Sequence, residues 1–152
     1  MTVTDTLALR IEKLGDWDDV SPNFTQDELF SPDTIGKVFL IDYEALLKLN
    51  RFRGHVGYPV LVNHGGNHLR GVRSAKEQMS LVKKGLTSAL SSLHLQGKAF
   101  DLTCPNKSVK WLKDAALEFA WSCVGYYPNS NFVHVDMRST ELTGIQTYYE
   151  VS

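Results

Sequence analysis

Apolar side chains recur at helical spacing in two stretches of the sequence. Residues 42–51 contain no internal Gly or Pro and place three leucines on one side: Leu46, Leu47 and Leu49. Residues 108–122 carry the clearer pattern, with apolar residues returning every three or four positions: Trp111, Leu112, Ala115, Ala116, Phe119 and Ala120. Both stretches are therefore predicted to be amphipathic helices.

Capping pairs indicate two shorter helices. Thr25 stands three residues before Glu28, which is the pattern of a capping box at the start of residues 25–30. Ser74 and Glu77 repeat this spacing and predict a helix that continues to residue 84.

Alternating apolar and polar residues predict two strands, at residues 98–104 and 131–138. Successive side chains on a strand point to opposite faces. Asp101 therefore lies opposite the apolar face of the first strand, and His134 and Asp136 lie opposite the apolar face of the second. An imidazole and carboxylates are thus predicted to project from the side of a sheet that does not face the core.

The length and composition fit one globular domain over residues 1–152, with a polar lead-in at residues 1–21. The chain has 152 residues, of which 43% are hydrophobic and 22% charged. A formal net charge of −1 provides no basic excess for a phosphate backbone, so nucleic acid is excluded as the expected partner. No run approaches the roughly 18 apolar residues of a membrane span. The two cysteines show no CxxC spacing and are expected to be free thiols.

Two histidines and one aspartate could form a metal site. His134 and Asp101 lie on the two predicted strands, and His94 lies on the segment that leads into the first strand. Three ligands of these types, with one open position for water, are typical of catalytic zinc sites. The alternative is that the histidines are ordinary hydrogen-bonded side chains and that Asp101 is a cap or turn residue. The spacing alone does not decide between these interpretations.

A longer motif adds a family resemblance. The chain contains Ser92-x-His94-x-x-Gly97-x-Ala99-x-Asp101, and later Gly125-Tyr126-Tyr127-Pro128 and Phe132-Val133-His134-Val135-Asp136. Together with Phe24-Thr25-x-x-Glu28-Leu29 and Gly71-Val72-Arg73-Ser74, these motifs resemble the M15 family of zinc peptidases, over about residues 22–138. The resemblance implies an α+β fold shared with the hedgehog signalling domain: a small, mainly antiparallel sheet with helices packed on one side.

The resemblance also implies roles for individual residues. It makes His94, Asp101 and His134 the ligands of one zinc ion. It makes Arg73 a residue that binds a substrate carboxylate or carbonyl, for which the planar guanidinium is well suited. The alternative for Arg73 is a surface salt bridge. Ser92 and Tyr127 are expected to contact the substrate, although Tyr127 could equally be a packing aromatic.

The identity of the general base is open. Several M15 members have a Glu shortly before the last histidine ligand, and residues 129–133 contain none. Asp136 is therefore the expected base, because it is the nearest carboxylate to His134. The competing interpretation is that Asp136 orients His134 or another ligand through a hydrogen bond.

One segment departs from the family pattern. A short buried strand is predicted at residues 60–62, and a glycine-rich loop at residues 63–68 follows it with His64 and His68. This loop either shapes the substrate cleft or is an ordinary surface loop.

The implied function is zinc-dependent hydrolysis of peptide bonds in peptidoglycan stem peptides or cross-links, by a monomer of phage or bacterial origin. The N-terminus has no signal-peptide pattern. We therefore expect synthesis in the cytoplasm, and action on the cell wall or periplasm or from a virion. One alternative is a non-catalytic, zinc-stabilised module of a phage particle. Another is a carboxypeptidase that acts on free stem peptides instead of the intact wall.

Overall fold

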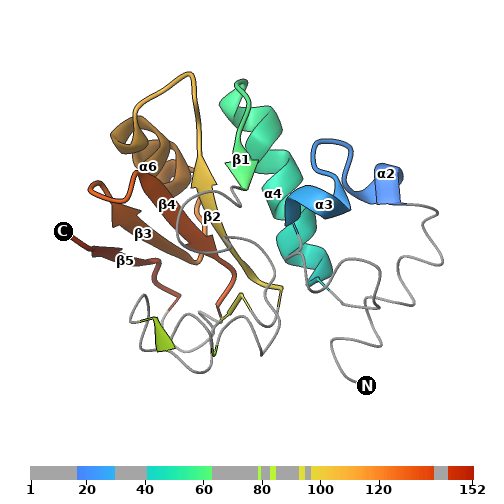
Figure 1. Ribbon diagram of the computed structural model, residues 1–152. Helices are drawn as coiled ribbons and strands as arrows, with labels where there is room; N and C mark the ends of the chain where they lie inside the picture. Colours follow the sequence, from blue (N-terminus) through green and yellow to red (C-terminus); the bar gives the residue numbers. More distant parts are fainter. Residues whose placement is uncertain are drawn as a thin grey trace.

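A five-stranded sheet forms the centre of the protein (Figure 1). The computed structural model describes residues 17–29, 41–62, 79, 83–84, 93–94, 97–138 and 144–152. The strands are β1 (Leu61–Val62), β2 (Ala99–Thr103), β3 (Cys123–Tyr127), β4 (Phe132–Asp136) and β5 (Thr147–Glu150). Their order across the sheet is β1-β2-β4-β3-β5, and only the β3–β5 pair is parallel. The predicted α+β class with a mainly antiparallel sheet is confirmed.

Four helices are described: α2 (Trp17–Val20), α3 (Gln26–Leu29), α4 (Tyr43–Val56) and α6 (Val109–Glu118). The capping box at α3 is confirmed, because the Thr25 backbone N–H donates to Glu28 Oε2 at 2.8 Å and the Glu28 N–H donates to Thr25 Oγ1 at 3.3 Å. Asp42 caps α4 by accepting the Ala45 N–H at 2.9 Å. No helix among these segments has the length and apolar character needed to cross a membrane.

One face of the sheet and the two longer helices share a single hydrophobic core. Helices α4 and α6 contribute apolar side chains to it, and the sheet contributes alternate residues of β2, β3 and β4. The fully buried members from these elements are Ala45, Leu46, Leu49, Phe52, Leu112, Ala116, Phe100, Leu102, Val124, Val133 and Val135. The opposite face of β2 and β4 therefore carries the polar residues, as the alternation predicts.

Several element bounds differ from those predicted. Helix α4 continues to Val56, where Gly57 adopts a φ of 76° at the C-cap. Helix α6 ends at Glu118 instead of residue 122, because the chain turns at Ala120 with a φ of 59°. Strands β3 and β5 were not predicted, and α2 lies within residues 1–21, which were predicted to be a polar lead-in. The loop at residues 63–68 and most of the predicted helix 74–84 lie outside the described residues.

Candidate metal centre

The register of β2 and β4 brings two of the expected ligands side by side. Asp101 pairs directly with His134, so both side chains leave the sheet on the face opposite the core. Asp101 Oδ1 lies 3.0 Å from His134 Nδ1. Both groups are well shielded from solvent, with side-chain exposures of 4% for Asp101 and 12% for His134.

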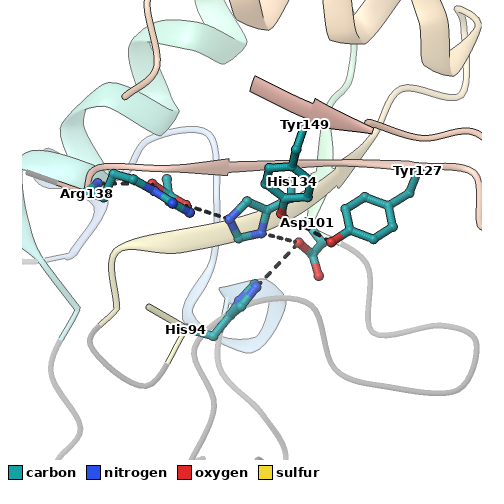
Figure 2. Close-up of polar contacts among 7 residues, drawn as sticks. His94, Asp101, Tyr127, His134, Arg138 and Tyr149 are labelled. Carbon is teal, nitrogen blue, oxygen red and sulfur yellow. Dashed lines mark hydrogen bonds and ion pairs between the residues drawn. The ribbon is translucent and has the colours of Figure 1, made fainter. Parts of the chain in front are cut away.

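His94 reaches the same carboxylate from the turn before β2. Gly97 adopts a φ of 66°, a conformation that favours glycine, and the Lys98 N–H closes the turn onto Leu93 O at 3.0 Å. The Asp42 N–H at the start of α4 donates to Gly97 O at 3.1 Å, which ties the turn to the helix. His94 is buried, and its Nε2 lies 3.4 Å from Asp101 Oδ1 (Figure 2).

These three side chains form a compact donor set. One nitrogen of His94, one nitrogen of His134 and one carboxylate oxygen of Asp101 lie within 4.8 Å of one another. Among the described residues this is the one group of three or more His, Cys, Asp or Glu side chains that could hold a metal ion. Imidazole nitrogens and a carboxylate oxygen suit zinc and other divalent transition metals.

Asp136 lies on the other side of the His134 ring. Its Oδ2 lies 2.7 Å from His134 Nε2, so the two ring nitrogens of His134 each face a carboxylate. Arg138 donates to the same carboxylate three times, from its backbone N–H and Nε to Oδ1 and from Nη2 to Oδ2, at 3.0, 3.0 and 2.7 Å. Asp136 is fully buried. Both of its oxygens are therefore engaged by protein groups.

The buried charges shift the pKa values of this network. Burial lowers the pKa of His134, but its hydrogen bonds with Asp101 and Asp136 outweigh that effect and raise the pKa to about 9. Burial raises the pKa of Asp136, whereas hydrogen bonds from His134 and Arg138 outweigh it and lower the pKa to about 2. Hydrogen bonding to Asp136 raises the pKa of Arg138. Without metal, these shifts favour the charged forms of His134 and Asp136.

This arrangement resembles a histidine ligand with a carboxylate partner. When a metal is bound through Nδ1, the Nε2–H of His134 would donate to Asp136, which fixes the tautomer and the ring orientation. Such an outer carboxylate is a common companion of histidine ligands to zinc. The donor set and its hydrogen-bond support therefore fit a mononuclear metal site.

Aromatic side chains border the cluster on the β3–β5 side. Tyr127 stacks on Phe132 with a centroid separation of 4.3 Å, and its hydroxyl lies 3.2 Å from the Tyr149 hydroxyl. The Tyr149 ring lies 6.2 Å from the His134 ring. Burial and the hydrogen bond with Tyr127 raise the pKa of Tyr149, so its hydroxyl stays protonated. Tyr149 is absent from the residues that the sequence singled out, because β5 shows no strand alternation.

The expected site residues thus fall into three groups. His94, Asp101 and His134 come together, whereas Asp136 and Tyr127 lie beside this cluster. Arg73 and Ser92 lie outside the residues that the structure describes. The two cysteines, Cys104 and Cys123, are free and buried, as expected.

This is a small α+β domain that carries two histidines and one aspartate in a site of the kind that metal-dependent hydrolases use. The sequence profile described as "Peptidoglycan L,D-endopeptidase MepK", of the M15 peptidases, matches residues 62–141. The chain therefore belongs to the M15 peptidase family, which confirms the resemblance seen in its motifs.

Two curated relatives show the same similarity. Peptidoglycan L,D-endopeptidase MepK of Escherichia coli is 35% identical over 68 residues, which cover 45% of this chain and 37% of the relative. A probable peptidoglycan L,D-endopeptidase MepK of Haemophilus influenzae is 36% identical over 66 residues, covering 43% of this chain and 36% of the relative. The matched part thus spans little more than a third of each relative.

Proposed function

We propose that the protein is a zinc-dependent peptidase that hydrolyses a peptide bond in peptidoglycan. The observation that carries this proposal is the meeting of His94, Asp101 and His134 on the polar face of the sheet, in a chain of the M15 family. These are the three protein ligands of a catalytic zinc site, with the fourth position left for water or substrate. When bound, zinc supplies a water of pKa about 7 and polarises the scissile carbonyl.

In this proposal Asp136 orients His134 and does not act as the general base. Its oxygens already accept hydrogen bonds from His134 and Arg138, and its side chain is fully buried. A base must reach the proton that it removes, either directly or through one water. The contacts of Asp136 favour the second of its two expected roles, in which it holds the imidazole with Nδ1 directed at the metal position.

The substrate-binding roles remain proposals. Tyr127 lies in β3 on the same face as His134 and is connected to Tyr149 beside the cluster, which supports a place next to the bound substrate. For Arg73 and Ser92 the support is the family resemblance alone. Arg73 would bind a carboxylate or carbonyl of the substrate, where a fork of N–H donors gives bidentate contacts.

The named relatives favour one substrate over the others. Because they are L,D-endopeptidases of peptidoglycan, we propose that this chain cuts an internal L,D bond and that it does not trim the end of a free stem peptide. We further propose that it acts at the cell wall as a monomer with one zinc ion.

Digestion of purified cell walls tests this function. Zinc-loaded protein is expected to release new amino termini from peptidoglycan sacculi, and mass spectrometry of the products should show an internal L,D cut. A chelator and the Asp101→Asn change should each abolish release. Asp114→Asn is the matched control, because Asp114 is an exposed carboxylate paired with Lys113 on α6, a helix that packs on the core face of the sheet, opposite the cluster.

Two results would contradict the proposal in different ways. If the zinc-loaded wild type releases no new amino termini, the peptidase function is wrong and a non-catalytic zinc module becomes the better account. If only free D-alanine is released, the chain is a peptidase but of the carboxypeptidase type.

A further inference from the structure

A single row of residues runs across four strands on the polar face of the sheet. Asp101 pairs with His134, His134 with Gly125, and Gly125 with Tyr149. Residues paired in this way project from the same face. The metal cluster occupies one end of the row and Tyr149 the other, with a glycine between them.

The glycine makes room for the tyrosine ring. A Cβ at position 125 would lie 2.4 Å from Cζ, 2.5 Å from the hydroxyl oxygen and 2.8 Å from Cε2 of Tyr149. The ring therefore lies directly over the backbone of Gly125, on the way from β5 to His134, and Figure 2 shows it beside the imidazole. Any side chain at position 125 would force this ring elsewhere.

Strand β5 is held in place at both ends. The Thr147 N–H donates to Ser122 O and the Val151 N–H donates to Tyr126 O, each at 2.9 Å. Just before the strand, Gln146 Nε2 donates to Leu117 O at 3.2 Å and to Trp121 O at 2.9 Å. The backbone of Tyr149 is thus fixed relative to β3, and its ring position is set by the space over Gly125.

The hydroxyl of Tyr149 also has a defined neighbour. It lies 3.2 Å from the hydroxyl of Tyr127, and the two rings meet edge to face at a centroid separation of 5.9 Å. If Tyr127 donates this hydrogen bond, the O–H of Tyr149 is directed elsewhere and is strengthened as a donor by the bond that its oxygen accepts.

We propose that Tyr149, seated over Gly125 and oriented by Tyr127, is a further catalytic residue that donates a hydrogen bond to the scissile carbonyl oxygen of the substrate. The inference rests on the proposed peptidase function. A donor fixed beside the metal position stabilises the negative charge that develops on this oxygen in the transition state. A neutral phenol does so without giving up its proton, so no further base or acid is required at this atom.

The first test compares two adjacent tyrosines. Tyr149→Phe removes one hydroxyl and keeps the ring, and it is expected to lower kcat on cross-linked peptidoglycan fragments by about 100-fold, as for loss of one oxyanion donor. KM, bound zinc and Tm should change little, which a structural role would not predict. Tyr148→Phe is the matched control: Tyr148 points to the other face, where its hydroxyl donates to Glu150 Oε1 at 2.6 Å, and kcat should be unchanged.

The second test moves the ring without removing it. Gly125→Ala is expected to swing the Tyr149 ring away and to lower kcat as much as Tyr149→Phe does, because the clashing atoms belong to the far end of one side chain. In a Tyr149→Ala background there is no ring to displace. The Gly125→Ala change should then cost nothing further in kcat.

The possible outcomes distinguish failure of the proposed role of Tyr149 from failure of the proposed peptidase function. An active wild type with an equally active Tyr149→Phe variant would overturn the role of Tyr149 and leave the peptidase function standing. A Gly125→Ala effect of the same size with and without the tyrosine would overturn the seating role of Gly125. An inactive wild type would refute the peptidase function itself, and this inference with it.

Discussion

The change Asp136→Asn tests the orienting role most sharply. It keeps the shape of the side chain but removes the charge that faces His134 Nε2 at 2.7 Å and Arg138 Nη2 at 2.7 Å. If Asp136 orients a metal ligand, the variant should bind zinc more weakly. If it is the general base, the variant should bind zinc normally and lose catalysis.

The size of the effect follows from the hydrogen bond between Asp136 Oδ2 and His134 Nε2, which is 2.7 Å long and shielded from solvent. Outer carboxylate partners of histidine ligands typically account for about 10–100-fold in metal affinity. We therefore expect a loss of zinc affinity of at least about tenfold.

The assay is competition for zinc with a chelator of known affinity, combined with kcat measured at saturating zinc. Asp114→Asn again serves as the control, because its carboxylate is exposed and should leave the zinc affinity unchanged. Unchanged zinc affinity in Asp136→Asn, together with a large fall in kcat, would refute the orienting role and restore Asp136 as the base.

Three further predictions concern the folded chain. In denaturant titrations, the metal-free protein should be most stable between about pH 4 and pH 6.5. The raised pKa of His134 contributes stability that is lost as pH rises from 6.5 through about 9. The lowered pKa of Asp136 contributes stability that is lost as pH falls from 3.8 through about 2. A flat profile would contradict the network. Cys123, whose pKa burial raises to about 12, should resist alkylation at pH 8 until the protein unfolds, and rapid native-state labelling by mass spectrometry would argue against its burial. Gly57→Ala should lower the free energy of unfolding by about 1 kcal/mol, because alanine is strained at the φ of 76° that this position adopts. No atom lies within 4 Å of the added Cβ, so the cost comes from the backbone conformation alone. An unchanged Tm would refute this strain argument.

The spacing of apolar and polar residues within short windows of the sequence correctly predicted several helices and strands. Strands β2 and β4 alternate apolar and polar residues, α4 and α6 carry apolar residues at helical spacing, and the capping box of Thr25 and Glu28 marks the start of α3. Strand β3 escaped prediction because Gly125 interrupts its alternation, and the reason for that glycine is the ring of Tyr149 from another strand. The early end of α6 depends on the turn at Ala120, which brings Trp121 into the core. Such contacts between distant segments are not visible in a window of sequence.

The sequence likewise predicted one part of the candidate site, and the rest depends on the folded structure. Alternation placed Asp101 and His134 on one face of the sheet, and the register of two strands then made them neighbours. The approach of His94 depends on a turn with a positive φ at Gly97, so it was implied by the family motif and not by periodicity. The position of Asp136 was predicted, but its hydrogen bonds with Arg138, two residues away, depend on side-chain geometry that alternation does not specify, and they change its proposed role.

The zinc content of the purified protein is the decisive measurement, because every proposed function of this site requires the cluster to hold zinc. Wild-type protein and the Asp101→Asn variant would be dialysed against the same dilute zinc solution, and the metal counted per chain. Asp101 Oδ1 contacts both imidazoles, so its loss should disrupt the whole donor set. We expect one zinc per wild-type chain and far less in the variant. Equal zinc in the two proteins would contradict the assignment of His94, Asp101 and His134 as the metal ligands.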